Sequence, residues 1–272
     1  MADERDRRGV LYPARLPQFE RILPPPELKD LVGWFWLVHW DIAAGRTSRQ
    51  QLLLFPLMNL VVQREGVTLS GPASAASHRD LAGKGWAVAA LLRPAAATAL
   101  ALSPATLIDR EVGFETPELL QEISRILEKG NGPAANPESG RALGAWFTRS
   151  CPDPDANGLR ANEFIDYVAA TRSAVSVEQV AEALGFSVRS LQRLSLRYVG
   201  LPPLAVIRRY RLQEAAQRVR ENPSASIAQI AAELRYTDQA HLAADFRKIL
   251  GFSPSTYRAH SQSAGPQSEY ES

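Results

Sequence analysis

The chain has 272 residues, of which 45% are hydrophobic and 22% are charged, and its formal net charge is +2. This length allows one large domain or two ordinary ones with a sizeable buried core, and the composition excludes global disorder and a collagen-like structure. The single cysteine, Cys151, excludes an internal disulfide framework and a zinc site built on cysteines.

The first residues of the chain give no targeting signal. Residues 1–8 are charged and no apolar stretch follows them, unlike in a signal peptide. The most apolar run, Trp86–Leu102, is interrupted by Arg93 and Pro94, and it falls short of the roughly 18 residues that span a bilayer. Together with the low cysteine content, these features predict a cytoplasmic protein without membrane contact.

Through residues 1–129, short apolar runs alternate with turn residues, which predicts a β-rich domain. Strands are expected over Phe19–Leu23, Val32–Trp40, Gln51–Phe55, Leu57–Gln63, Val67–Ser70 and Trp86–Leu92. Short helices are expected over Pro26–Leu31, Ala95–Ala101 and Pro117–Glu128. This pattern is typical of a β-barrel or sandwich with short helices at one end, so we expect an α+β chain.

Two stretches rich in Gly, Pro and Asn follow, at residues 129–137 and 151–158. One short helix is expected between them, over Glu138–Ser150. We therefore assign residues 130–158 to a linker, which would let the two parts of the chain respond to each other without forming one core.

Residues 159–262 form a helical domain in this interpretation, and residues 263–272 form a frayed tail. Helices are expected over Phe164–Ala170, Val177–Leu184, Leu191–Val199, Leu204–Val219, Ile227–Leu234 and Leu242–Leu250. One pattern occurs twice, at Ser176–Leu191 and again 50 residues later at Ser226–Leu242. Each copy has a capped helix, a small alanine, a turn and a second capped helix, which is the arrangement of a helix-turn-helix. The expected N-caps are Ser176 and Ser187 in the first copy, and Ser226 with either Thr237 or Asp238 in the second.

The charge of the chain is unevenly distributed. Residues 156–262 hold 14 basic and 9 acidic residues, whereas residues 1–155 hold 17 basic and 18 acidic ones. A basic helical part indicates either a nucleic-acid partner or an ordinary solvated helical surface, and charge alone does not distinguish the two.

The segment 162–260 resembles the DNA-binding domain of the AraC/XylS family of bacterial transcription regulators. The resemblance is carried by Leu191–Leu194, by the connector Val206–Ala215 and by Gly251–Arg258. The first part of the chain resembles, more weakly, a sensor or dimerisation domain found in a subset of this family, through Pro24–Leu28, Trp34–Trp36 and Leu92–Pro94.

The resemblance implies that one subunit places two recognition helices in successive major grooves of double-stranded DNA, about 34 Å apart. It also implies RNA polymerase as a partner. The residues expected to contact DNA are Ser187, Arg189, Ser190, Gln192, Arg193, Arg197, Arg208, Arg209, Thr237, Gln239, His241 and Arg247. Gln192 and Arg193 are the expected base-reading pair, because these side chains make forked hydrogen bonds to adenine and guanine. Further basic residues are expected to bind phosphate or to form surface salt bridges, and these are Arg211, Lys248 and Arg258.

The second recognition helix departs from the family pattern. Ala244 stands where relatives carry a polar or basic residue, and Asp238 and Asp245 add negative charge. Arg235 replaces the usual turn glycine, so an altered turn is expected, because a positive φ is unfavourable for arginine. Ser195 replaces the usual phenylalanine of the first unit and is expected to thin the core.

In the first domain, Trp34, Trp36 and Trp40 are separated by even numbers of residues, which places them on one face of a strand. They either pack in the core or line a pocket for a small-molecule effector. The expected effector-binding residues are Trp34, Trp36 and Arg93, and the domain is also a candidate for homodimer formation. No metal site, cofactor or catalytic group is expected. The alternative function is a small-molecule-binding or enzymatic barrel fused to a DNA-binding module.

Overall fold

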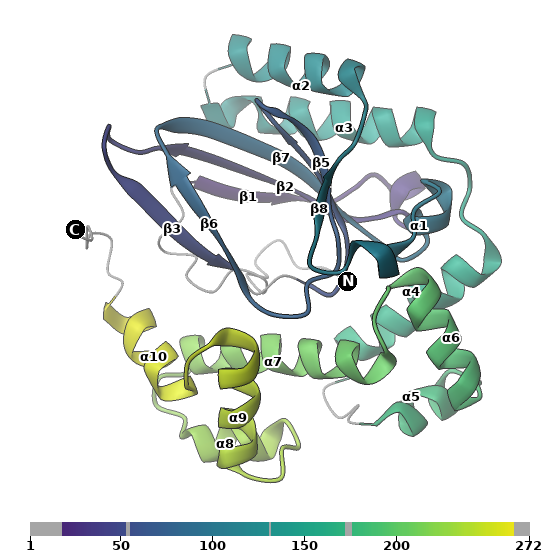
Figure 1. Ribbon diagram of the computed structural model, residues 1–272, viewed down its shortest axis with the longest axis vertical. Helices are drawn as coiled ribbons and strands as arrows, with labels where there is room; N and C mark the ends of the chain where they lie inside the picture. Colours follow the sequence, from purple (N-terminus) through teal and green to yellow (C-terminus); the bar gives the residue numbers. More distant parts are fainter. Residues whose placement is uncertain (1–17, 53–54, 131, 172–175, 264–272) are drawn as a thin grey trace.

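The computed structural model describes residues 18–52, 55–130, 132–171 and 176–263 (Figure 1). The part up to Ser150 is built on antiparallel strands with helices on one side, and the described residues from Ala156 onward are helical. This confirms the expected α+β class. The charged N-terminal residues and the frayed tail, apart from Ser263, lie outside the described residues.

The strands of the first domain form one sheet and one ribbon. The sheet has six antiparallel strands in the order β1-β2-β7-β4-β5-β8, and β3 pairs with β6 in a separate two-stranded ribbon. The strands are β1 (Gln18–Ile22), β2 (Val32–Asp41), β3 (Thr47–Leu52), β4 (Asn59–Gln63), β5 (Gly66–Ser70), β6 (Ser77–Ala82), β7 (Lys84–Leu92) and β8 (Glu111–Gly113).

The structure corrects several predicted elements. Strand β6 escaped prediction because its residues are polar and mostly exposed, as an edge ribbon allows. Strand β3 begins earlier than the predicted Gln51–Phe55, part of which lies outside the described residues. The helices predicted over Pro26–Leu31 and Ala95–Ala101 shrink to one turn each. The short helices are η2 (Pro26–Leu28), α1 (Ala96–Ala99), η3 (Pro104–Leu107) and η4 (Gly132–Ala135).

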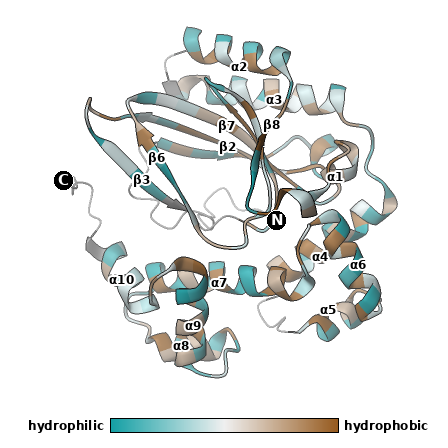
Figure 2. Cartoon of the chain, viewed as in Figure 1, coloured by the Kyte–Doolittle hydropathy of each residue, from teal (hydrophilic) through white to brown (hydrophobic). Residues whose placement is uncertain are grey.

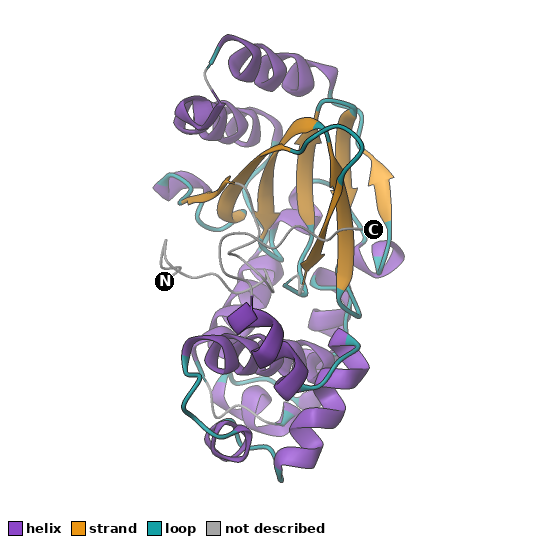
Figure 3. Cartoon of the chain, turned by 90° about the vertical axis from the view of Figure 1, so that its left-hand side faces the viewer, coloured by secondary structure: helices purple, strands orange, loops and turns teal. Residues whose placement is uncertain are grey.

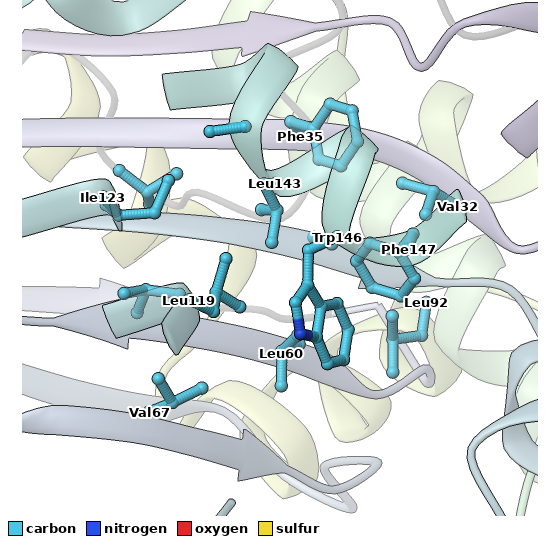
Figure 4. Packing of buried hydrophobic residues seen from close by; sticks show 14 of the residues in the cluster. Val32, Phe35, Leu60, Val67, Leu92, Leu119, Ile123, Leu143, Trp146 and Phe147 are labelled. Atoms are coloured by element: carbon cyan, nitrogen blue, oxygen red, sulfur yellow. The ribbon is translucent and has the colours of Figure 1, made fainter. Parts of the chain in front are cut away.

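One face of the sheet is covered by helices α2 (Pro117–Lys129) and α3 (Asn136–Ser150) (Figure 3). Helix α2 alternates hydrophilic and hydrophobic residues along its length (Figure 2), and it buries its apolar side. Figure 4 shows side chains of both helices meeting those of the strands, with Leu143, Trp146 and Phe147 of α3 among them. Residues 130–158 are therefore not a linker: α3 belongs to the core of the first domain, and only the short segment 151–155 separates it from α4 (Ala156–Ala170).

The helical domain consists of two helix-turn-helix units on either side of a long connector (Figure 1). Its helices are α4, α5 (Val177–Ala183), α6 (Val188–Tyr198), α7 (Pro203–Glu221), α8 (Ile227–Glu233), α9 (Gln239–Leu250) and α10 (Pro254–Ser263). Helix α7 supplies apolar residues to the cores of both units, with Val206 and Ile207 in the first and Leu212 and Val219 in the second. The connector therefore fixes the two units to one rigid element.

The two domains share buried surface, contrary to the expectation of independent cores. Phe55, Leu57 and Leu91 of the first domain lie in one apolar cluster with residues of α4 and α7. Asn162 of α4, which is 3% exposed, accepts a hydrogen bond from the Ala95 amide at 3.1 Å. Its side-chain amide also donates to the carbonyl of Asp30 at 2.8 Å. The first domain is thus held against the helical one by apolar packing and by buried hydrogen bonds.

Candidate functional site

N-caps and a glycine turn determine where the two helices of the first helix-turn-helix unit begin and how they are joined. Ser176 accepts from the amide of Gln179 at the start of α5, and Ser187 accepts from the amide of Ser190 at the start of α6. Gly185 adopts a φ of 68° between the helices, a conformation that glycine takes without steric cost. The caps predicted at Ser176 and Ser187 are therefore present, and they begin both helices of the unit.

Helix α6 divides its side chains between the core and the solvent. Leu191, Leu194 and Tyr198 are buried on one side of the helix. Arg189, Gln192, Arg193 and Arg197 are exposed, while Ser190 is half-buried. The Ser187 and Ser190 hydroxyls lie 2.8 Å apart, so these two serines are engaged in the cap. The exposed face of α6 presents three arginines and one glutamine to a partner.

Buried Ser195 completes the end of this unit. Its hydroxyl donates a hydrogen bond of 2.6 Å to the carbonyl of Leu201, and the residue is fully buried. The serine thus satisfies a main-chain acceptor just after the helix, where phenylalanine would supply only apolar volume.

The second unit repeats the backbone geometry of the first. Arg235 has a φ of 56°. Its amide donates a hydrogen bond to the carbonyl of Ala232, just as the amide of Gly185 donates to the carbonyl of Glu182. The expectation of an altered turn is wrong, because the arginine adopts the left-handed conformation of the glycine it replaces. That conformation costs a residue with a Cβ atom about 1–3 kcal/mol.

A pair of arginines holds the two turns in equivalent ways. Arg160 donates to the carbonyl of Leu184 at 2.6 Å and lies 4.3 Å from the ring centroid of Phe186. Arg211 donates to the carbonyl of Leu234 at 2.9 Å and lies 4.2 Å from the ring centroid of Tyr236. Each arginine therefore caps the C-terminal end of the first helix of its unit and covers the aromatic residue after the turn. Arg258 similarly donates to the Ala225 carbonyl.

Helix α9 carries the second set of predicted DNA contacts. Asp238 is its N-cap and accepts from the amide of His241 at 2.7 Å, which resolves the predicted choice between Thr237 and Asp238. The His241 ring lies 3.3 Å from the Thr237 hydroxyl and packs edge-on against Tyr236. Gln239, Ala244 and Arg247 are exposed. This face therefore carries one exposed arginine, whereas that of α6 carries three.

The two adjacent arginines of the connector lie in different environments. Arg208 is exposed, whereas Arg209 is 3% exposed and donates to the carbonyl of Ala73 at 2.8 Å. Burial lowers the pKa of Arg209 to about 10, while the nearby Asp109 raises it. The assignment of Arg209 to DNA is wrong for this arrangement of the domains, because the first domain covers its guanidinium.

The second candidate site is a cavity of about 160 Å³ between the sheet and the β3–β6 ribbon. Alternation along β2 places Trp34, Trp36 and Trp40 toward it, while Phe35 and Leu37 point to the core beneath α2 and α3. Gly85 is the cross-strand partner of Trp40, and a Cβ there would lie 2.2 Å from the indole ring. The tryptophans thus line a cavity, and they also pack against buried apolar residues beside it.

Sequence reasoning missed two other residues of this cavity. Arg21 of β1 lies 4.5 Å from the ring centroid of Trp34 and 5.7 Å from that of Phe19. Phe55 packs edge-on against Trp34 with ring centroids 5.0 Å apart. Phe19 and Arg21 are two residues apart, a spacing that places both on the same face of a strand. That this face lines the cavity follows from the pairing of β1 with β2, which the sequence alone does not give.

Arg93 does not line the cavity. Its guanidinium pairs with Asp166 of α4 at 2.6 Å, and its amide donates to the carbonyl of Leu31. The assignment of Arg93 to the effector is therefore wrong in this structure: the residue lies at the contact between the domains.

The remaining chemistry is sparse. Within the described residues, no group of three or more His, Cys, Asp and Glu side chains is arranged to hold a metal ion. Burial raises the pKa of the Cys151 thiol to about 11, which leaves little reactive thiolate near neutral pH. No helix in the described part of the chain has the length and apolar character needed to cross a membrane.

Comparison with known proteins finds one family match in each domain. Residues 164–260 match a family described as a helix-turn-helix domain, and residues 20–112 match a domain of unknown function, DUF6597. The transcriptional activator AarP of Providencia stuartii is 33% identical over 84 residues, which are 31% of this chain and 62% of AarP. YkgA of Escherichia coli, a putative transcriptional regulator, is 34% identical over 31% of this chain and 35% of its own length. The matched segment thus spans less than two thirds of either relative.

A solved transcriptional regulator from Chromobacterium violaceum with an AraC-type DNA-binding domain is 26% identical, over 39% of this chain and 95% of that one, with a TM-score of 0.36. The family match falls within α4 to α10 and includes both helix-turn-helix units. A relative described as a putative AraC-like transcription regulator, from Streptomyces antibioticus, is 33% identical over 31% of this chain and 28% of its own length. Residues 164–260 thus match a helix-turn-helix domain family, and this chain is similar to AraC-like regulators.

Proposed function

We propose that this protein is a transcription regulator that binds specific sites in double-stranded DNA through α6 and α9, under the control of a small molecule bound in its first domain. The observation that carries the proposal is the pair of helix-turn-helix units, each with a capped second helix whose polar side chains are exposed. Their attachment to one connector suits two successive major grooves on one side of the duplex.

Gln192 and Arg193 are the base-reading residues of this proposal, because both are exposed on α6 and can form forked hydrogen bonds with base edges. Arg189, Arg197 and Arg208 are also exposed and are assigned to phosphates. In the second unit, the assigned contacts are Thr237, Gln239, His241 and Arg247. Ser187 and Ser190 stand at the start of α6, where free helix amides also attract phosphate.

The test begins with footprinting of the protein on its genome, which defines the operator. Affinity for that operator and for random DNA is then compared for the wild type, for Arg193→Ala and for Arg125→Ala. The last is a matched control, because Arg125 is exposed on α2, away from the helical domain (Figure 1). Arg193→Ala should lose about 1–3 kcal/mol on the operator and little on random DNA.

Equal losses on both DNAs would make Arg193 a phosphate contact instead. The wider proposal fails if the full chain prefers no sequence and its affinity for DNA does not fall with rising salt, since phosphate contacts impose that dependence.

Four further expectations belong to this proposal. Relatives named as activators support RNA polymerase as a partner, and sedimentation at the concentrations used for DNA binding would detect a homodimer. A protein that acts on the chromosome of a bacterium works in the cytoplasm. The cavity is proposed to bind a ligand and not to catalyse a reaction, since no Asp or Glu is among its described lining residues.

A further inference from the structure

One large apolar side chain is exposed on the side of α6 that is proposed to face DNA. Among the described residues, the exposed large hydrophobic ones are Leu23, Leu196 and Leu204, and Leu196 is 45% exposed. We propose that Leu196 reads the C5-methyl group of a thymine in the major groove; this inference rests on the proposed function, in which α6 binds DNA. The contact gives α6 a base preference beyond the hydrogen bonds assigned to Gln192 and Arg193.

Leu196 lies in the middle of the exposed face of α6. The exposed residues of this helix follow one another at the spacing of a single helix face, and they are Arg189, Gln192, Arg193, Leu196 and Arg197. Because consecutive residues point about 100° apart, Leu196 projects between Gln192 and Arg193, about 40° from the first and 60° from the second. A partner that both of these side chains contact therefore also covers Leu196.

The same spacing serves base reading in another helix-turn-helix variant. A homeodomain contacts bases through four residues of one helix at positions i, i+3, i+4 and i+7, and in α6 these positions are Arg189, Gln192, Arg193 and Leu196. The four residues from Gln192 to Leu196 advance about 6 Å along the helix axis, close to two base steps. For a helix that lies along the groove, the thymine is thus about two base pairs from the base that Gln192 reads.

The surroundings of Leu196 favour DNA over a protein partner. The other exposed residues of α6 are three arginines and one glutamine, and the helix contains no Asp or Glu. Such a face is attracted to the phosphates on either side of the groove. An apolar protein surface would instead cover these charges without pairing them, at a high cost.

The chemistry of a leucine selects the base. Its side chain has no hydrogen-bonding group, so it would leave the donors and acceptors of a base edge unpaired. The C5-methyl group of thymine is the apolar feature that bases present in the major groove, and apolar side chains contact it. Leu196 therefore favours thymine over cytosine at one position of the operator.

The experiment measures the affinity of the full chain for its footprinted operator, in which each thymine under α6 is replaced in turn by deoxyuridine. This replacement removes the methyl group and keeps the O4 acceptor that the groove presents. One buried methyl group corresponds to about a fourfold change in a dissociation constant, so one deoxyuridine should weaken binding about fourfold. In Leu196→Ala the same deoxyuridine should cost less than about 1.5-fold, because its partner is already gone.

Leu23→Ala is the matched control, since it truncates an equally exposed leucine of the first domain. It should keep the full cost of the deoxyuridine. Leu196→Met should also keep it, because methionine is apolar and of similar volume. The salt dependence of operator binding should be the same in Leu196→Ala as in the wild type, since no phosphate contact is lost.

The proposal is overturned if no deoxyuridine under α6 weakens binding of the wild type, or if the loss is equally large in Leu196→Ala. It is also overturned if Leu196→Ala lowers transcription with operator affinity unchanged, since Leu196 then contacts a protein such as RNA polymerase. In each of these cases, a wild type that prefers its operator over random DNA leaves the proposed function standing. A wild type without that preference refutes both.

Discussion

Replacing Asn162 by alanine should weaken the contact between the domains by an amount that follows from its two hydrogen bonds. The substitution removes the partner of the fully buried Ala95 amide and of the carbonyl of half-buried Asp30. A buried main-chain group left without a partner costs about 1–3 kcal/mol. With the second group partly reached by water, the expected total is about 2–4 kcal/mol.

Urea unfolding measures this loss, with tryptophan fluorescence reporting mainly on the first domain and circular dichroism on the helices. In the variant the midpoint should fall, and the two signals should separate as coupling between the domains weakens. Asn157→Ala is the matched control, because it makes the same change at an exposed position of α4 and should stay within about 0.5 kcal/mol. Equal midpoints for the two variants would refute the role given to Asn162.

Three further predictions concern the turn of the second unit, the thiol and the two recognition helices. Arg235→Gly should raise the free energy of unfolding by about 1 kcal/mol, because glycine adopts the positive φ of 56° without strain. Gly185→Ala should lower the free energy of unfolding by about as much. A loss of stability in Arg235→Gly would contradict this account. Alkylation of Cys151 by iodoacetamide at pH 8 should be much slower in the folded chain than in urea, since the pKa of its thiol is raised to about 11. Because the unfolded thiol ionises first as pH rises, Cys151 should also reduce stability between about pH 9 and pH 11, and Cys151→Ser should remove that dependence. Finally, operator changes under α6 should cost more affinity than changes under α9, where exposed Ala244 offers no donor; equal costs in a competition assay would show that both helices contribute alike.

The helix-turn-helix units are the part of this protein that local sequence specifies best. The caps predicted at Ser176, Ser187 and Ser226 are present, and the apolar face of α6 is the one its periodicity indicates. These features depend on residues within one or two turns of one another, so spacing alone reveals them. The alternation of tryptophans along β2 is predictable for the same reason.

The features that the sequence did not reveal depend on contacts between distant segments. Arg208 and Arg209 are neighbours in the chain, but consecutive residues point about 100° apart on a helix, and only the position of the first domain determines which one is covered. Arg93 similarly finds Asp166 across the domain contact. The helix α3 was assigned to a linker because it lies between two stretches rich in Gly, Pro and Asn. Pro137, in the first of these stretches, lies at the first turn of the helix, where proline is favoured.

The amide of Ala76, in the segment between β5 and β6, donates to the carbonyl of Ile249 in α9 at 2.8 Å. A hydrogen bond between main-chain atoms is retained when a side chain is replaced. An alanine scan of either domain would therefore not detect this contact, and regulation would not change. The same property makes it tolerant of sequence drift: the segment can vary in composition while it still ties the first domain to the second recognition helix. Ala76→Pro removes the donor, so it would reveal the contribution of this hydrogen bond. Fusing the helical domain to an unrelated first domain would also remove the hydrogen bond.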